Sequence, residues 1–161
     1  MYIFAPMVDQ KDIQIINLLQ KNARMTASEI AHEVDLSVPA TAERIKKLTE
    51  AKVIQSFSAH VDAKKLGFDL SAFIAVVSAS SDHYQEIIEL STVDERVLEC
   101  HSITGDGSHL LKVRVRNSSE LEKCLRDIQS WPGVIRTQTM IVLSTFKESL
   151  ALNLKVAEKV E

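Results

Sequence analysis

Residues 26–48, TASEIAHEVDLSVPATAERIKKL, contain two helix-start signals separated by a short turn. Thr26 and Glu29 have the spacing of a capping box, in which the hydroxyl accepts a hydrogen bond from the Glu29 amide and the carboxylate reaches back. Ser37 can cap the next helix, and Pro39 falls in its first turn, where a missing amide costs little. The pattern predicts a helix from Thr26 to Glu33 or Val34, a turn at Asp35-Leu36, and a helix from Ser37 to about Ala51.

The segments on either side extend this pattern. Asp9 can cap an earlier helix that runs to about Asn22, with Ile13, Ile16 and Leu19 on one face. Residues 53–61 alternate in the manner of a strand and include β-branched and aromatic side chains. Two short helices joined by a tight turn and followed by a β-ribbon are typical of a winged helix-turn-helix.

The helix from Ser37 separates an inward from an outward face. Thr41, Ile45 and Leu48 recur at helical spacing and are expected to face inward. The helix N-terminus offers amides and a positive dipole to phosphate, and small residues there let the backbone approach a DNA groove. The candidate phosphate-binding cations are Arg44, Lys46, Lys47 and Lys52. The alternative is a three-helix bundle whose cations form a solvated face.

The second half of the chain alternates strand and helix patterns. Strands are expected over 70–79, 97–104, 109–115 and 134–146, with helices after Ser81 or Asp82 and after Asn117. This order predicts a ferredoxin-like βαββαβ domain, so the fold class is α+β. We expect a winged helix-turn-helix over 1–61, a linker over 62–70 and the ferredoxin-like domain over 71–147. Residues 148–161 form a tail that could be helical or could fray.

The charge is distributed unevenly along the 161 residues. The net charge of −3 argues by itself against a nucleic-acid partner. Up to Leu66, however, there are nine basic and eight acidic residues, a net of +1, and beyond it ten basic and fourteen acidic residues, a net of −4. The two parts are therefore expected to have different roles. The apolar runs are too short to span a bilayer and no secretory signal is evident, so we expect a cytoplasmic protein with no membrane partner.

The chemistry-bearing residues favour binding over catalysis. The histidines are scattered; His101 and His109 are expected to be neighbours across a hairpin, but Cys100 and His101 are adjacent in a strand and point to opposite faces. Structural histidines are therefore favoured over a metal site. Cys100 and Cys124 are expected to act as small core hydrophobes, and no nucleophile motif is present. We expect no enzyme activity, no catalytic residues, no metal and no cofactor.

The turn Gly105-Asp106-Gly107-Ser108 is the candidate small-molecule site. Glycines permit positive φ, exposed amides can hold a carboxylate, and Asp106 can meet an ammonium group. An amino-acid zwitterion suits that combination. The alternative is a hairpin turn with no further role.

In a ferredoxin-like domain the two helices cover one face of the sheet, and the other face is exposed unless a further element or subunit packs on it. The simplest partner is a second copy, and a dimer also presents two DNA-binding heads to two half-sites. We therefore expect at least a dimer.

The order and spacing of motifs over residues 8–147 resemble the Lrp/AsnC (feast/famine) transcriptional regulators. The motifs are Asp9-x-x-Asp12-x-x-Ile15-Ile16, Ala23-Arg24, Glu29-Ile30-Ala31, Leu36-Ser37, Glu43-Arg44-Ile45-Lys46-Lys47-Leu48, Val53-Ile54, Val61-Asp62-x-x-Lys65-Leu66-Gly67, Val97-x-Glu99-Cys100, Ile103-Thr104-Gly105-Asp106, Leu110-Leu111-Lys112-Val113, Pro132-Gly133-Val134, Thr137-x-Thr139 and Val142-Leu143. Many relatives carry aromatic and acidic residues where this hairpin has Gly107-Ser108-His109. Thr41 also replaces a usual apolar residue; its methyl can pack while its hydroxyl bonds to the preceding turn.

The resemblance implies a sequence-specific DNA-binding transcriptional regulator that assembles from dimers into tetramers or octamers. Its ferredoxin-like domain would sense an amino acid or a related small metabolite. The DNA-binding residues would be Ser37, Pro39, Ala40, Glu43, Arg44, Lys46 and Lys47. The effector-binding residues would be Gly105, Asp106, Gly107, Ser108, His109, Thr137 and Thr139. The alternative function is a metabolite-binding oligomeric scaffold without DNA binding.

Overall fold

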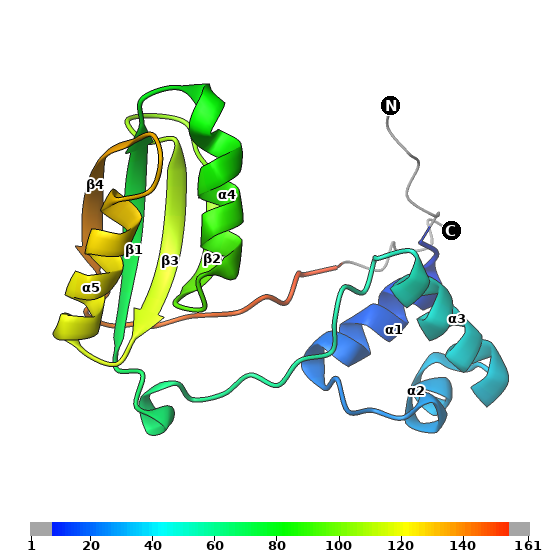
Figure 1. Ribbon diagram of the computed structural model, residues 1–161. Coiled ribbons are helices and arrows are strands. Elements are labelled where there is room, and N and C mark those ends of the chain that lie inside the picture. The colour runs from blue at the N-terminus through cyan, green and yellow to red at the C-terminus, as the bar shows by residue number, and fades with distance from the viewer. Residues whose placement is uncertain (1–7, 155–161) are drawn as a thin grey trace. The chain divides into compact units, whose positions relative to one another are not determined.

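The computed structural model describes residues 8–154, which divide into two compact units (Figure 1). Residues 8–60 together with 148–154 make the helical unit, and residues 61–147 make the sheet unit. The chain therefore leaves the helical unit, forms the whole sheet unit and then returns.

The helical unit contains α1 (Gln10–Lys21), α2 (Ala27–Val34) and α3 (Val38–Glu50). Each begins at the cap that the sequence predicts, because Asp9, Thr26 and Ser37 each accept a hydrogen bond from a backbone N–H of the first turn. The α2–α3 turn passes through Asp35, whose φ of 53° lies in the left-handed region. The predicted helix-turn-helix is confirmed.

One apolar cluster holds the three helices together. Its buried members come from all of them: Ile15, Leu19, Ile30, Val34 and Leu48. Fully burying a side chain of this size contributes about 1.5–3 kcal/mol, so packing of these faces, more than helix propensity, stabilises the unit.

The C-terminus of α3 is closed by a Schellman motif. Lys52 N–H donates to Thr49 O at 3.0 Å, and Val53 N–H donates to Leu48 O at 2.9 Å. Lys52 has a φ of 58°, in the left-handed region that favours glycine. A lysine at this position therefore carries a backbone cost of about 1 kcal/mol.

The strand predicted over residues 53–61 is not formed in the described chain. Val53 and Ile54 pack against the helical core, and residues 55–61 continue without helix or strand. A strand needs a partner for its N–H and C=O groups. The described residues of the helical unit provide none, so alternation alone gave a wrong prediction here.

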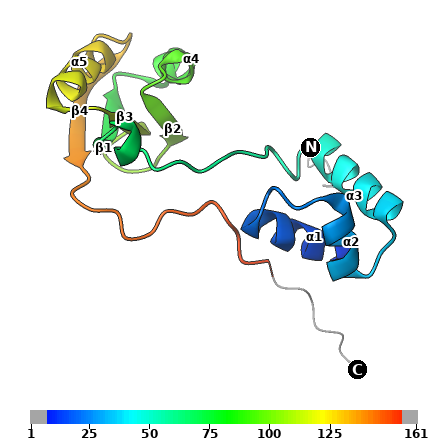
Figure 2. The same ribbon diagram turned by 90° about the horizontal axis from the view of Figure 1, so that it is seen from below.

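The sheet unit begins with a 3₁₀ turn, Lys64–Leu66, that ends at Gly67 with a φ of 85°. The strands β1 (Leu70–Ser78), β2 (Val97–Ser102), β3 (His109–Val115) and β4 (Val134–Ile141) form one antiparallel sheet in the order β2-β3-β1-β4 (Figure 2). The helices are α4 (Tyr84–Val93), preceded by a 3₁₀ turn at Ser81–His83, and α5 (Ser118–Gln129). This order confirms the predicted ferredoxin-like domain.

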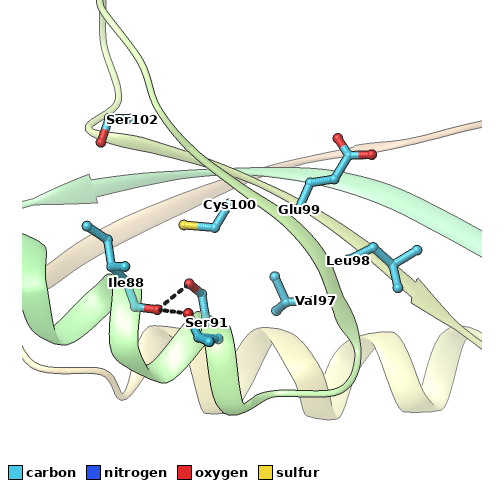
Figure 3. Close-up of a pocket in the computed structure, with 8 residues that line it drawn as sticks. Ile88, Ser91, Val97, Leu98, Glu99, Cys100 and Ser102 are labelled. Atoms are coloured by element: carbon cyan, nitrogen blue, oxygen red, sulfur yellow. Dashed lines mark hydrogen bonds between the residues drawn. The ribbon is translucent and has the colours of Figure 1, made fainter. Parts of the chain in front are cut away.

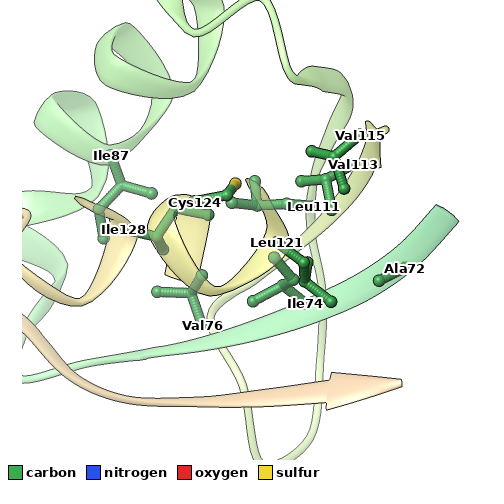
Figure 4. Close-up of a cluster of buried hydrophobic side chains, with 10 residues drawn as sticks. All are labelled: Ala72, Ile74, Val76, Ile87, Leu111, Val113, Val115, Leu121, Cys124 and Ile128. Atoms are coloured by element: carbon green, nitrogen blue, oxygen red, sulfur yellow. The ribbon is translucent and has the colours of Figure 1, made fainter. Parts of the chain in front are cut away.

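The core of the sheet unit lies between one face of the sheet and the two helices. Its ten buried residues are Ala72, Ile74, Val76, Ile87, Leu111, Val113, Val115, Leu121, Cys124 and Ile128 (Figure 4). The predicted period-2 pattern of β3 is confirmed, because Leu111, Val113 and Val115 all belong to this core.

The opposite face of the sheet is defined by the strand register. Phe73 lies between Lys112 and Met140, and residues directly opposite each other share a face. Because Phe73 alternates with the buried Ala72 and Ile74, these side chains point away from the helix layer. Met140 remains 47% exposed there.

The last strand ends earlier than expected, and the described part of the tail takes the non-helical alternative. Strand β4 stops at Ile141, whereas the sequence pattern predicts a strand to Phe146. Residues 148–154 of the tail contain no helix or strand, and the remainder of the tail, 155–161, lies outside the described residues. Within residues 8–154, no helix combines the length and apolar character needed to cross a membrane.

Candidate functional site

The exposed N-terminus of α3 is the candidate DNA interface. Ser37 and Pro39 are exposed and Ala40 is half-buried, so the start of the helix is lined by small side chains. The Ser37 hydroxyl accepts from Ala40 N–H at 3.3 Å, and Ser37 O accepts from Thr41 N–H at 3.0 Å. Since proline has no amide, Val38 N–H is the first-turn donor left for a phosphate, together with the helix dipole.

Thr41 is fully buried on the inward side of α3. Its hydroxyl donates to Ser37 O at 3.1 Å, one turn earlier. The predicted arrangement is confirmed: the methyl packs while the hydroxyl is satisfied by the helix backbone.

Lys46 and Lys47 extend outward from α3 and are loosely paired. Lys46 Nζ lies 3.8 Å from Glu50 Oε1, and Lys47 Nζ lies 3.5 Å from Glu43 Oε1. These lysines, Glu43 and Glu50 are all exposed. Exposed i, i+4 pairs contribute about 0.3–0.5 kcal/mol, so a phosphate can displace the carboxylates at little cost.

Arg44 points to α1 instead. Its Nη1 donates to Asp9 Oδ2 at 2.6 Å and to Asp12 Oδ1 at 2.8 Å. The pKa of Asp9 is lowered by hydrogen bonding to the Asp12 amide first and by Arg44 as well. Arg44 therefore differs from Lys46 and Lys47 in its contacts. Arg44 joins α3 to α1, whereas the two lysines face outward from α3.

Sequence reasoning missed this contact, and also one from Lys11 Nζ to Val34 O. The Arg44 partners lie 35 and 32 residues away, and Val34 lies 23 residues from Lys11. The available signal was the pair of aspartates around the first helix start, which could have been matched with a basic residue on a packed neighbour.

The candidate effector hairpin has an exposed tip. Gly105 has a φ of 106°, and Gly105 and Asp106 are exposed. Gly107 is half-buried, and a Cβ there would lie 3.3 Å from Val76 O. Glycine at 107 therefore lets the tip lie close to the end of β1.

Ser108 and His109 face into the protein. Ser108 donates both its amide, at 2.8 Å, and its hydroxyl, at 3.1 Å, to Val76 O. His109 is fully buried, contacts Tyr84 edge-on at 4.9 Å between ring centroids and lies with Nδ1 3.0 Å from Ser108 Oγ. Burial lowers the pKa of His109, which favours the neutral form of the ring. Its Nε2 is buried without a hydrogen-bond partner.

Thr137 and Thr139 lie on the helix side of the sheet. They pair with Val76 and Ile74, two core residues, and Thr137 Oγ1 accepts from Gln129 Nε2 at 3.0 Å. Val76 also pairs with His109, so Thr137 and His109 share one row two strand spacings apart, about 10 Å. The seven predicted effector residues therefore form an exposed tip and a set embedded behind it.

The register also corrects the expected histidine pair. His101 lies opposite Leu110, whereas His109 lies opposite Ser102. Residues one step apart point to opposite faces, so His101 and His109 are not neighbours on one face. Among residues 8–154, no group of three or more His, Cys, Asp and Glu side chains could hold a metal ion.

A groove of about 440 Å³ lies between α4 and the edge strand β2 (Figure 3). Ile88, Val97, Leu98 and the half-buried thiol of Cys100 contribute its apolar part. The predicted effector residues do not line this groove.

Two family models match the chain. A winged helix-turn-helix DNA-binding model matches residues 8–55, and the Lrp/AsnC ligand binding domain matches residues 71–152.

Known proteins match along most of the chain. The transcriptional regulator FL11 of Pyrococcus abyssi is 38% identical over 148 residues, covering 92% of this chain and 97% of its own. The regulator LrpA of Bacillus subtilis is 32% identical over 122 residues, covering 76% and 90%. Among solved structures, the feast or famine regulatory protein of M. tuberculosis complexed with L-methionine has a TM-score of 0.84 at 31% identity, covering 90% and 98%. A Neisseria meningitidis regulator in complex with L-Met has a TM-score of 0.84 at 27% identity, covering 90% and 96%.

Proposed function

This chain belongs to the Lrp/AsnC family of DNA-binding transcriptional regulators, and we propose that it reads DNA with the outward side of α3 under the control of an amino acid. The observation that carries this proposal is the capped, exposed start of α3, followed by outward lysines on the same helix. A helix of this kind enters the major groove with its N-terminal residues against base edges.

The residues of α3 divide into two roles. Ser37, Pro39, Ala40 and Glu43 lie toward the base edges, where small side chains allow a close approach. Lys46 and Lys47 bind phosphates after releasing their carboxylates. Arg44, which the family resemblance assigns to DNA binding, instead fixes the angle of α3 on α1 through Asp9 and Asp12.

The effector is an amino acid held at the tip of the β2–β3 hairpin. The Gly105 region supplies backbone amides for its carboxylate, and the exposed Asp106 supplies a charge for its ammonium group. Ser108 and His109 support the tip from within the sheet unit, and Thr137 and Thr139 complete the predicted set on the helix side of β4. The L-methionine complexes of the two structural relatives agree with this ligand class.

The active species is an oligomer in the cytoplasm, and its role is regulatory rather than catalytic. The sheet face that carries Phe73 and Met140 pairs with a second copy, and such dimers assemble into tetramers or octamers. Ligand binding shifts the balance between assemblies, since a ligand biases only states that it binds differently.

The DNA-binding proposal is tested by the salt dependence of binding to the gene's own upstream DNA. Lys46→Ala with Lys47→Ala should weaken binding to all sequences and reduce the slope of log K against log salt by about 0.9 for each lost phosphate contact. Fluorescence anisotropy at several salt concentrations measures both quantities.

The matched control is Lys64→Ala with Lys65→Ala, because these lysines are also exposed and loosely paired, with Asp69 at 3.6 Å and Asp62 at 3.8 Å. An unchanged slope in the α3 variant would refute the phosphate role. Failure of the unmodified protein to bind any DNA would favour the oligomeric scaffold instead.

A further inference from the structure

Residues 152–154, near the red end of the described chain, are held by α1 of the helical unit (Figure 1). Gln20 Nε2 donates to Leu152 O at 3.1 Å, and Leu152 N–H donates to Gln20 Oε1 at 2.7 Å. Asn17 Nδ2 donates to Leu154 O at 3.0 Å. Three hydrogen bonds therefore hold the segment, two at Leu152 and one at Leu154.

These contacts hold the backbone of the segment rather than its side chains. A primary amide offers one donor and one acceptor side by side, so Gln20 can pair with both polar groups of a single residue. Asn17 lies one turn earlier on the same side of α1. The Leu152 side chain remains 69% exposed, so at this residue the backbone hydrogen bonds make the contact, whereas Leu154 is half-buried.

Because residues 152–154 are bonded to α1, the chain between Val142 and Leu152 links the two units a second time. Val142 N–H still bonds to Ser71 O at the end of the sheet, and ten residues lead from Val142 to Leu152. The other connection takes sixteen residues, from Ile54 in the helical core to Leu70 in β1. At about 3.4 Å per residue the C-terminal connection reaches at most about 34 Å. The other connection contains the closed turn around Lys64–Leu66, in which Phe68 N–H donates to Ala63 O at 2.9 Å, so its extended part is the stretch from Ile54 to Ala63, which reaches about 31 Å. The two connections therefore have similar reach.

We propose that residues 152–154 form a clasp on Asn17 and Gln20 of α1, which makes residues 142–152 a second tether of each DNA-binding unit. The docking surface is the side of α1 that carries the Asn17 and Gln20 side-chain amides. The segment that docks on it is the backbone of residues 152–154 of the same chain. The clasp keeps the DNA-binding units of an oligomer close enough to engage two half-sites together. This consequence for operator binding rests on the proposed function.

Hydrogen exchange tests the clasp without DNA. In the unmodified protein the Leu152 amide should exchange more slowly than its neighbours, because it is the donor to Gln20. Gln20→Ala should remove that protection. Leu152→Pro removes the same donor without altering α1, and Leu150→Pro is its control because the Leu150 side chain is 93% exposed and the hydrogen bonds to α1 are made at Leu152 and Leu154. An unprotected Leu152 amide in the unmodified protein would overturn the clasp.

Binding to two DNA lengths tests the tether. Two tethers of similar reach confine a unit about as strongly as one tether of half the length. Because the local concentration of a tethered unit falls as about the −3/2 power of tether length, release of the clasp should weaken two-half-site binding about threefold. Gln20→Ala and Leu152→Pro should show this loss, and Leu150→Pro should not. Binding to a single half-site should be unchanged in all three.

Each result has a separate meaning. Equal two-site affinity in the clasp variants and the control would refute the tether. If the Leu152 amide is protected from exchange but the protein binds no DNA, the clasp is supported and the proposed function is refuted.

Discussion

Replacing Arg44 by methionine separates its two possible roles, one in DNA contact and one in helix packing. Methionine keeps an unbranched side chain of similar reach but removes the guanidinium that bonds to Asp9 and Asp12. The Arg44 side chain is 32% exposed, against 13% for Asp12 and 48% for Asp9. The Asp12 contact is therefore the more sheltered of the two.

The expected loss of stability follows from these exposures. A partly buried, charge-assisted hydrogen bond contributes about 1.5–3 kcal/mol, which fits the Asp12 contact. The more exposed Asp9 pair adds about 0.2–1 kcal/mol. Because one nitrogen makes both bonds, the two contributions do not add fully, and we expect Arg44→Met to lose about 2 kcal/mol.

The pH dependence gives a second measurement of the same contact. The lowered pKa of Asp9 means that its stabilising contribution is complete above the ordinary value of 3.8 and is lost as the pH falls through the lower folded-state value. The difference between the unmodified protein and Arg44→Met should therefore shrink below about pH 4.

Urea denaturation can assign the effect to one unit. Trp131 is the sole tryptophan and lies in the sheet unit, so its fluorescence follows that unit, whereas far-ultraviolet circular dichroism also follows α1 to α3. Arg44→Met should shift the circular dichroism transition and leave the fluorescence transition in place. The exposed Arg24→Met in the same unit is the control. Unchanged stability combined with a smaller salt slope of DNA binding would show that Arg44 binds phosphate, and would refute the packing role.

Three further substitutions test other features. Lys52→Gly should raise the stability of the helical unit by about 1 kcal/mol in urea denaturation, because it relieves a left-handed backbone; a loss of stability would contradict this account. Asp106→Ala should abolish the thermal shift given by the effective amino acid in a screen of all twenty and leave ligand-free DNA binding intact; an unchanged shift would mean that the hairpin is a turn alone. Arg96→Met should destabilise the sheet unit by about 2 kcal/mol, followed by tryptophan fluorescence, because Arg96 donates to Asp94 at 2.6 and 2.8 Å and lies 2.9 Å from Asp127. Arg96 lowers the pKa of Asp94, so this loss should diminish as the pH falls below about 4, and a pH-independent loss would argue against the ion pair.

Local signals in the sequence predicted the elements that depend on local contacts. Helix starts at Asp9, Thr26 and Ser37 follow from hydrogen bonds spanning three residues, and the structure contains all three. The strand over 53–61 failed for the opposite reason, because a strand depends on a partner that alternation cannot identify. The end of β4 was predicted too late for the same reason. β4 ends at Ile141 because its pairing with β1 ends at Ala72, and the sequence after Ile141 does not show where the partner strand stops.

In the candidate site, too, the features set by local contacts could be predicted and those set by distant partners could not. The exposed positions at the start of α3 and the tip at Gly105 and Asp106 could be predicted from caps and glycines. The inward orientation of His109 could not, because it depends on how β3 is registered against β1 and β2. The partners of Arg44 were also hidden, since the packing of α3 on α1 decides which of its basic residues point inward.

The contact between Asn17 and Leu154 spans 137 residues of sequence, and this separation has a consequence for how the protein matures. During synthesis α1, α2 and α3 leave the ribosome before the strands of the sheet unit, and their short-range contacts let them fold early. Residues 152–154, which α1 holds, are made after β1, β2, β3 and β4 have been translated. A newly made chain therefore acquires a folded helix-turn-helix before the sheet exists, and residues 152–154 can reach α1 only after the four strands have been made.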